Sequence, residues 1–356
     1  MKKTFRRRAG SLLLALCMCI SFFAAICTDC NTALAAGYTK MKLTWFDVGA
    51  GDSLYIKLPN GKNVLIDAGT KSSGEKVVSK LKDMNVSTVH YLVSTHPDAD
   101  HAGGLQAVFK ELKVRYFYYP DDAAYSTATA KEVLRLAKKE PDCTLINPKR
   151  GRTISGGNGC KLRFVQKDKD YSTSNQDSLA LFIDYGKLEV LVCGDNEKGS
   201  QTAIEKHNVD ILQLPHHGSK YAVTADFIER FDPEKVVVST DGEKYGHPDV
   251  ESFKRLKAYD SNIKVWRTDK KGDITLTATA SSWSFAKTGV SVSKYCSTST
   301  GSGGGSVSGS YVYVTATGSR YHLSKSCSGL SSAKSISKVK KSEAVSRGLT
   351  PCKICA

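Results

Sequence analysis

The chain has 356 residues, of which 40% are hydrophobic, and its formal net charge is +16. This length and apolar content are enough for a substantial core and fit one large domain with smaller segments attached. Beyond the first 36 residues no apolar run approaches the roughly 20 residues of a spanning helix, which excludes a multi-span membrane channel.

The first 36 residues have the pattern of a secretory signal peptide. Five basic residues among the first eight precede the apolar run Leu12–Cys27, and Ala33-Leu34-Ala35 then supplies a small-residue cleavage pattern. The apolar run is shorter than the roughly 20 residues that span a membrane. We therefore expect cleavage near Ala36 and a secreted or cell-envelope protein, with an uncleaved signal anchor as the alternative.

Residues 37–287 alternate strand-like and helix-like segments. The expected strands are Lys42–Asp47, Ser53–Leu58, Asn63–Asp67, Val89–Ser94, Arg115–Tyr119, Lys161–Gln166, Ser178–Tyr185, Leu188–Cys193 and Lys235–Ser239. The expected helices are Gly74–Met84, Gly104–Leu112, Thr129–Glu140, Lys198–His207, Thr224–Arg230 and Val250–Ala258. Groups of strands that alternate with single helices indicate an α/β fold in which helices cover mixed sheets.

The densest cluster of metal-binding side chains is the loop His96-Pro97-Asp98-Ala99-Asp100-His101, which directly follows an apolar strand. Packing does not explain four such side chains in six residues, because burying an unpaired carboxylate is costly. Imidazole together with carboxylate suits zinc or manganese. A polar loop that happens to contain two histidines is the alternative interpretation.

Other polar residues also come just after apolar strands. They are Asp67, Asp195, the pair His216-His217 and His247. Open α/β sheets place their active sites at the carboxyl ends of strands. Because five of the eight histidines fall in these motifs, the sequence predicts one metal site built from all of them.

Six motifs in this order resemble the metallo-β-lactamase-fold hydrolase domain of ComEC-type competence DNA-uptake proteins. They are Phe46-Asp47-Val48-Gly49-Ala50-Gly51-Asp52-Ser53, Leu65-Ile66-Asp67-Ala68-Gly69, the stretch from Ser94 to Gly104, Cys193-Gly194-Asp195, Leu214-Pro215-His216-His217-Gly218-Ser219 and Tyr245-Gly246-His247-Pro248. The resemblance implies a four-layer αβ/βα sandwich. Ala50 replaces the usual glutamine, and the membrane channel of ComEC proteins has no counterpart in this sequence.

The resemblance implies that His96 and Asp98 hold one metal ion, that Asp100, His101 and His217 hold a second, and that Asp195 bridges them. His216 is a further candidate ligand or a phosphate contact. Most relatives have a histidine in place of Asp98 and another before the bridging aspartate, where this chain has Ser174-Asn175-Gln176-Asp177-Ser178. Harder oxygen ligands shift the preference from zinc toward manganese or magnesium. We expect one or two divalent ions, zinc or manganese.

The remaining site residues have assigned roles or open alternatives. Asp100, Asp195 and His247 are the expected catalytic residues, and Asp67 is expected to orient ligands. Asp52 has the same role or simply forms a turn. Asn175, Ser178 and Ser219 are candidate substrate contacts, although loop caps explain the first two equally well.

A Ser/Gly-rich stretch, residues 288–310, predicts a flexible linker to a small module at 311–356. There His322, Cys327, Cys352 and Cys355 have the spacing of a structural Cys₃His zinc site, which so small a unit needs in order to fold. The module resembles one found at the ends of secreted bacterial nucleases and related hydrolases. A disulfide is the alternative, since the expected compartment is oxidising.

Charge and motifs together indicate a polyanionic substrate. Eight basic residues and one acidic residue lie in the last 46 positions, which favours nucleic acid, teichoic acid or an anionic envelope surface. We expect metal-dependent hydrolysis of phosphodiesters in DNA or another nucleic acid outside the cytoplasm. A phosphodiesterase or phosphorylcholine-esterase-like hydrolase of teichoic acid is the second hypothesis, and an envelope-binding protein without activity is the third.

Overall fold

The computed structural model describes residues 39–121, 125–166 and 171–296, and the ranges 311–322, 327–331, 333, 335–340, 343–344 and 347–352. The chain forms two compact units, Met1–Thr298 and Ser299–Ala356. The expected signal peptide, most of the expected linker and Cys355 lie outside the described residues. Among the helices that are described, none has the length and apolar character to cross a membrane.

The first unit contains two eight-stranded mixed sheets. The strands of the first sheet, in spatial order, are β15 (Trp283–Phe285), β14 (Ile274–Ala278), β1 (Met41–Trp45), β2 (Leu54–Lys57), β3 (Asn63–Ile66), β4 (Thr88–Val93), β5 (Lys113–Tyr118) and β6 (Thr144–Ile146). Neighbours from β15 to β3 pair antiparallel, and those from β3 to β6 pair parallel.

The second sheet repeats this division into antiparallel and parallel parts. Its strands, in spatial order, are β16 (Val290–Ser291), β13 (Lys264–Arg267), β12 (Lys235–Val238), β11 (Ile211–Gln213), β10 (Leu188–Val192), β9 (Leu181–Tyr185), β8 (Cys160–Phe164) and β7 (Thr153–Gly157). Strands β10 to β13 are parallel, while β7 to β10 and the pair β13–β16 are antiparallel.

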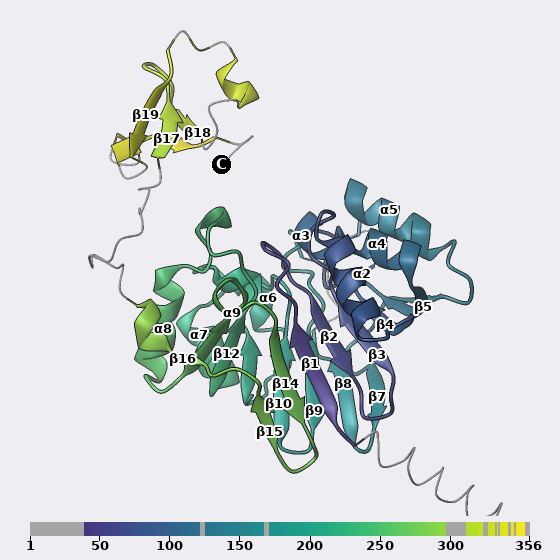
Figure 1. Cartoon of the computed structure of the whole chain (residues 1–356). Coiled ribbons are helices and arrows are strands. Elements are labelled where there is room, and N and C mark those ends of the chain that lie inside the picture. Colours follow the sequence, from purple (N-terminus) through teal and green to yellow (C-terminus); the bar gives the residue numbers. More distant parts are fainter. Residues whose placement is uncertain are drawn as a thin grey trace, which may run out of the picture. The chain divides into compact units, whose positions relative to one another are not determined.

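Helices cover the outer faces of both sheets (Figure 1). The α-helices are α2 (Gly74–Asp83), α3 (Ala99–Ala102), α4 (Leu105–Glu111), α5 (Ala128–Ala137), α6 (Lys198–Gln201), α7 (Ala225–Phe231), α8 (Val250–Tyr259) and α9 (Thr268–Lys271), and the 3₁₀ turns are η1 (Pro215–Gly218), η2 (Lys244–Gly246) and η3 (Val292–Tyr295). One apolar cluster fills the space between the sheets. A second joins the first sheet to α2, α4 and α5, and a third joins the second sheet to α7, α8 and η3. This arrangement confirms the predicted four-layer α/β sandwich.

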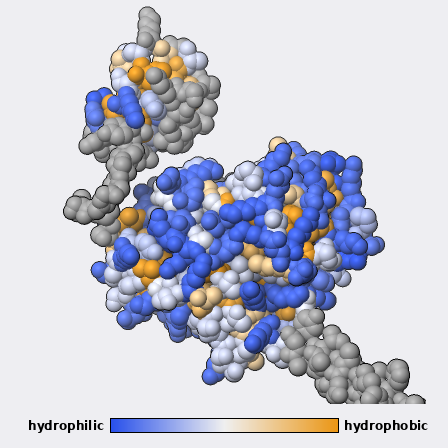
Figure 2. Space-filling view, in the orientation of Figure 1, coloured by the Kyte–Doolittle hydropathy of each residue, from blue (hydrophilic) through white to orange (hydrophobic). Residues whose placement is uncertain are grey.

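The sequence of each layer explains its place. Strand β3, Asn-Val-Leu-Ile, is buried along its whole length, as expected where two layers cover a strand. Helix α2 buries Val77, Val78 and Leu81 on one side, which is the spacing of an amphipathic helix. Hydrophilic side chains dominate the face seen in Figure 2, and the apolar residues of the three clusters are buried.

Several boundaries differ by a few residues from the sequence-based expectation, and two differ by more. The helix expected over Lys198–His207 ends at Gln201, because the following segment instead bonds to the second sheet through Glu205 N, which donates to Val165 O at 2.9 Å. The expected linker also begins later. Residues 290–291 pair with β13 and Val292 is fully buried, so the first unit extends past residue 287.

The second unit is built on a small sheet of four strands. Their order is β19 (Ser337–Lys340), β17 (Tyr311–Val314), β18 (Arg320–His322) and β20 (Thr350–Pro351), and η4 spans Ser328–Leu330. Its larger apolar cluster contains Val312, Val314, Tyr321 and Ala344. So few buried apolar side chains provide little hydrophobic stabilisation, which makes a cross-link or metal valuable to this unit.

Candidate metal centre

The parallel parts of both sheets direct the predicted site residues to one edge of the sandwich. Asp67 follows β3, and the loop from His96 to His101 follows β4. From the second sheet, Asp195 follows β10 and the pair His216-His217 follows β11. The structure therefore brings together residues that are more than 100 positions apart.

Four imidazoles converge on a single carboxylate at this edge. The distances from their Nε2 atoms to the nearer oxygen of Asp195 are 3.7 Å for His96, 3.1 Å for His101, 3.6 Å for His216 and 3.8 Å for His217. Asp195 is almost completely buried, as are His96, His101 and His217. Asp195 is thus the centre of the cluster, in the place expected for a bridging ligand.

The other ring nitrogens orient these imidazoles. Nδ1 of His101 donates to Asp67 Oδ2 at 2.9 Å, Nδ1 of His216 donates to Glu197 Oε1 at 2.9 Å, and Nδ1 of His217 donates to Ser239 O at 3.1 Å. A proton on Nδ1 leaves the lone pair on Nε2, which faces the cluster. This division of the two nitrogens is typical of metal-ligating histidines.

The backbone is unusual where His216 and His217 lie. Both residues have positive φ, 49° and 53°, and Gly218 follows with φ 84°. Residues other than glycine seldom adopt this conformation, and it costs on the order of 1–3 kcal/mol per residue. The strain lets two successive imidazoles reach the same carboxylate, an outcome that neither a regular helix nor a strand provides.

The two carboxylates of the hexad lie at the outer side of the cluster. Asp100 Oδ2 is 3.8 Å from His217 Nε2, and Asp98 Oδ2 is 3.9 Å from His96 Nε2. Asp98 also accepts a hydrogen bond of 2.9 Å from Ser174 Oγ. Ser174 belongs to the segment Ser174–Ser178, in which the resemblance led us to expect a histidine. This segment therefore lies beside Asp98, but it contributes a hydroxyl.

The donor set fits divalent metal ions. Within the described part of the chain, His96 Nε2 and Asp195 Oδ1 are fully buried and lack a hydrogen-bond partner, an arrangement that is costly unless something else binds them. Candidate ligand atoms lie within 4.8 Å of one another in three groups that share His101. These are His96, His101 and Asp195, then Asp100, His101 and His217, and finally Asp52, Asp67 and His101. Imidazole nitrogens 3.4 Å apart, on His101 and His217, complete a pattern suited to cations.

The electrostatics also favour a cation. Burial acts to raise the pKa of Asp195, but the nearby His101 and His217 outweigh it and hold that pKa well below its usual range. Burial acts to lower the pKa of His217, yet Asp195 and Asp52 raise it to about 9. The carboxylates thus favour a proton on the neighbouring imidazole, and a metal ion that binds this imidazole must displace the proton.

A series of buried polar side chains leads from Trp45 to His217, and most of it was not predicted from the sequence. Trp45 Nε1 donates to Gln213 Oε1 at 2.7 Å, and Gln213 Nε2 donates to Asp52 Oδ2 at 2.6 Å. Asp52 Oδ1 in turn lies 3.4 Å from His217 Nδ1. A buried glutamine at the end of the apolar strand β11 was the only sequence signal for this connection between the two sheets.

Replacing Gln213 with leucine should lower the free energy of unfolding by roughly 3 kcal/mol. The change leaves the Trp45 indole N–H and one Asp52 oxygen buried without their partner, and each such loss costs about 1–3 kcal/mol. Urea unfolding followed by tryptophan fluorescence measures it. In a double-mutant cycle with Trp45→Phe, the two losses should not add; full additivity would show that the side chains are uncoupled.

Asp67 holds its predicted place next to the ligands. Besides binding His101, it accepts hydrogen bonds from the backbone N and the Oγ1 of Thr95, at 2.8 and 2.6 Å. The turn before Asp52 packs just as tightly against the metal loop, because a Cβ at Gly51 would lie 2.2 Å from Asp100 O. These contacts explain why the motifs around Asp52 and Asp67 accompany the metal loop.

Substituting Asp67 with asparagine should weaken metal binding about 10- to 100-fold, the usual cost of removing a group that orients a ligand. The amide places an N–H group or a weaker acceptor against His101 Nδ1. Competition with a chromophoric chelator measures the affinity. An unchanged affinity in a normally folded variant would rule out this orienting role.

The candidate substrate contacts occupy different positions. Ser178 and Ser219 are almost completely buried; Ser178 Oγ accepts from Asp195 N at 3.2 Å, and Ser219 Oγ accepts from Tyr221 N at 3.3 Å. Both hydroxyls therefore bind the backbone next to the cluster. Asn175 is half-buried in the loop beside Asp98, and its role as a substrate contact stays a prediction.

His247 lies at the edge of the cluster, with its ring centroid 5.2 Å from that of His216. Burial and the two neighbouring histidines lower its pKa to about 4, so the ring is neutral at pH 7. Its Nδ1 is buried and has no hydrogen-bond partner among the described residues. A neutral imidazole in this position is suited to bind a substrate atom.

The second unit contains a separate group of candidate ligands. His322, Cys327 and Cys352 are buried, and one ligand atom of each lies within 4.8 Å of the others. The two sulfur atoms are 3.9 Å apart, well beyond the roughly 2.05 Å of a disulfide bond. The fourth predicted ligand, Cys355, lies outside the described residues.

Comparison with known proteins agrees with this geometry. Residues 46–242 match the metallo-beta-lactamase superfamily. ComE operon protein 3 of Bacillus subtilis (strain 168) is 28% identical over 250 residues, covering 64% of this chain and 32% of that protein. Competence protein ComA of Neisseria gonorrhoeae is 28% identical over 238 residues, covering 65% and 31%. The chain thus spans about a third of the length of these curated relatives.

Among solved structures, the metallo-beta-lactamase fold protein YhfI from Bacillus subtilis aligns with a TM-score of 0.46 at 13% identity, covering 70% of this chain and 100% of that one. A third curated relative, Recombination protein 2 of Haemophilus influenzae (strain ATCC 51907 / DSM 11121 / KW20 / Rd), is 24% identical over 247 residues, covering 63% of this chain and 28% of that protein. With more than half of its length matched, the chain belongs to the metallo-β-lactamase superfamily and is related to the ComEC-type competence proteins.

Proposed function

We propose that this protein is an exported metal-dependent phosphodiesterase that cleaves nucleic acid. The observation that carries the proposal is the convergence of four imidazole Nε2 atoms on Asp195, with two buried atoms that have no hydrogen-bond partner among the described residues. Members of this superfamily are in general metal-dependent hydrolases. Bound divalent ions would lower the pKa of a water molecule and neutralise charge on a phosphate.

The chain's own residues supply orientation and selectivity for this reaction. Asp67, Glu197 and the Ser239 carbonyl fix the tautomers of the ligating imidazoles. The oxygen-rich first site, with Asp98 in place of a histidine, favours manganese or magnesium over zinc. His247, neutral at pH 7, is placed to bind a phosphate oxygen of the substrate.

The nature of the substrate is inferred from three features. The relatives include competence proteins, the chain is strongly basic, and the leader pattern of the first 36 residues favours export. A positively charged exported hydrolase encounters nucleic acid and anionic wall polymers outside the cytoplasm. The competence relatives favour nucleic acid over teichoic acid.

Purified protein loaded with Mn²⁺, Mg²⁺ or Zn²⁺ tests the proposal. We expect metal-dependent cleavage of a labelled oligonucleotide and no release of glycerol phosphate from teichoic acid. Intact oligonucleotide in the presence of protein with measured bound metal would overturn the nuclease assignment. Release of glycerol phosphate instead would identify the wall-polymer esterase of the second hypothesis.

We also propose that the second unit binds a structural zinc ion through His322, Cys327, Cys352 and Cys355. Three of these ligands already lie together, and thiolate with imidazole is the preferred donor set for zinc. The small apolar cluster of this unit offers little alternative stabilisation.

A further inference from the structure

Two tyrosines flank the metal centre with their rings in solvent. Tyr221 and Tyr245 are 65% and 66% exposed, more than any other large hydrophobic side chain in the described ranges. Tyr221 comes shortly after His217 in the chain, and Tyr245 shortly before His247. Exposed aromatic rings are common singly, but these two belong to the same loops that carry the site.

Each ring has a lysine beside it. Lys220 Nζ lies 5.3 Å from the centroid of Tyr221, and Lys244 Nζ lies 4.9 Å from that of Tyr245. An ammonium group at this distance over a ring is attracted to the negative face of the ring. The site is therefore bordered by two repeated pairs, each consisting of an apolar platform and a positive charge.

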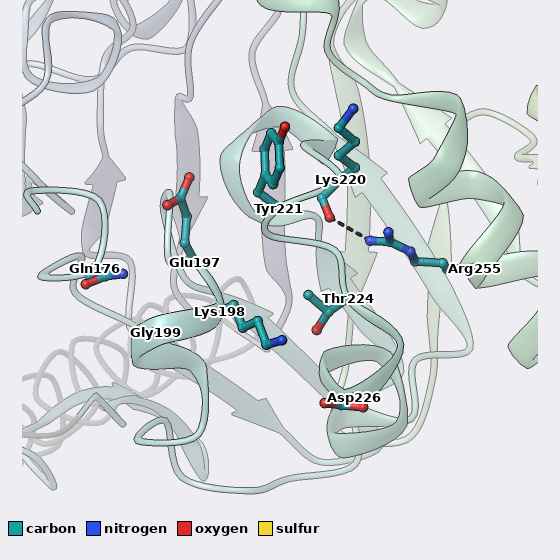
Figure 3. Close-up of a pocket in the computed structure, with 9 residues that line it drawn as sticks. All are labelled: Gln176, Glu197, Lys198, Gly199, Lys220, Tyr221, Thr224, Asp226 and Arg255. Atoms are coloured by element: carbon teal, nitrogen blue, oxygen red, sulfur yellow. Dashed lines mark hydrogen bonds between the residues drawn. The ribbon is translucent and has the colours of Figure 1, made fainter.

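Tyr221 lines an open pocket with a volume of about 470 Å³, in which its ring stands between Glu197 and Lys220 (Figure 3). Lys198 and Arg255 add positive charge, and the Arg255 guanidinium is fixed by its hydrogen bond of 2.6 Å to Lys220 O. The pocket also contains two carboxylates, Glu197 and Asp226. Glu197 Oε1 also accepts a hydrogen bond from His216 Nδ1, so this side chain connects the pocket with the metal cluster.

The second tyrosine is linked to the cluster from the other loop. The Tyr245 ring centroid is 6.5 Å from that of His247, whose ring is 5.2 Å from His216. A substrate whose phosphate lies at the metal cluster thus has an exposed aromatic ring within reach on the Tyr221 loop and another on the Tyr245 loop.

We propose that Tyr221 and Tyr245 are stacking platforms for the nucleobases that flank the cleaved phosphodiester, and that Lys220 and Lys244 bind the neighbouring phosphates. Every nucleobase has a face that stacks on an aromatic ring, and lysines track the backbone. A glycerol phosphate polymer has the phosphates but no ring to stack. The inference rests on the proposed phosphodiesterase function and adds the determinant of its substrate class: a nucleotide chain with unpaired bases.

The test compares two oligonucleotides with the same sugar-phosphate backbone, one with bases and one abasic throughout. For Tyr221→Ala and Tyr245→Ala we expect kcat/KM on the base-bearing strand to fall at least about fivefold each. The abasic strand should be cleaved equally by wild type and variants. Tyr221→Phe should retain activity on both strands, because a phenyl ring still stacks.

Tyr259→Ala is the matched control, since Tyr259 is also an exposed tyrosine, 40% accessible, but does not line the pocket. It should cleave both strands like wild type. If the tyrosine variants match wild type on the base-bearing strand, or lose equally on both strands, the stacking role is overturned while the hydrolase function stands. If metal-loaded wild type cleaves neither strand, the proposed function itself fails.

Discussion

Replacement of Asp195 by asparagine is expected to reduce metal-dependent hydrolysis by at least about 10³-fold, because several kcal/mol of charge stabilisation depend on the metal it holds. All four imidazole Nε2 atoms lie between 3.1 and 3.8 Å from an oxygen of Asp195. An amide of the same shape removes the negative charge that balances them and provides only one oxygen. Metal content should fall together with activity.

Two measurements check this result: kcat/KM on an oligonucleotide, and bound metal by elemental analysis after gel filtration. Asp184→Asn is the matched control, because Asp184 is a partly exposed carboxylate in the adjacent strand β9 and belongs to none of the candidate ligand groups. It should keep wild-type activity and metal. If Asp195→Asn kept both, the carboxylate would not be the bridging ligand.

Zinc removal is expected to unfold the second unit while the first unit stays folded. Structural zinc contributes on the order of 10–16 kcal/mol in small modules, more than the few buried side chains of this unit supply. Limited proteolysis of the whole chain should therefore give a stable fragment ending near the linker after chelation. Cys352→Ser should give the same fragment without chelator.

Cys296→Ser is the control for this experiment. Cys296 lies in the first unit, where its Sγ donates to Phe253 O at 3.3 Å, and it belongs to none of the groups of candidate ligands. Its substitution should leave zinc content and the proteolysis pattern unchanged. A second unit that withstands chelators but is digested after reduction would instead contain a disulfide.

The convergence of the candidate metal ligands could be predicted from sequence because each follows an apolar strand or stands in a compact motif. His96, His101, Asp195 and His217 meet as expected, since parallel strands in both sheets end at the same edge. The strands after residue 260 were harder to predict from the sequence. Strand β14, Ile-Thr-Leu-Thr-Ala, lies between β15 and β1, and β1 comes more than 200 residues earlier in the chain.

The supporting groups were not predictable for a similar reason. Glu197 and Gln213 look like ordinary polar residues, and their partners are known only once the sheets are assembled. The same is true of Ser178, for which a substrate contact and a loop cap were equally good interpretations and whose hydroxyl accepts a hydrogen bond from the backbone N of Asp195. The sequence indicates the candidate metal ligands, whereas the groups that orient them depend on tertiary contacts.

The division of the ligands between two sheets has a consequence for assembly. His96, Asp98, Asp100 and His101 come from the first sheet, while Asp195, His216 and His217 come from the second. A bound ion would therefore link the two sheets, and neither the segment up to β6 nor the segment from β7 onward supplies the full ligand set. Two fragments cut between β6 and β7 should thus recover high-affinity binding only when they associate, so metal uptake reports on their assembly.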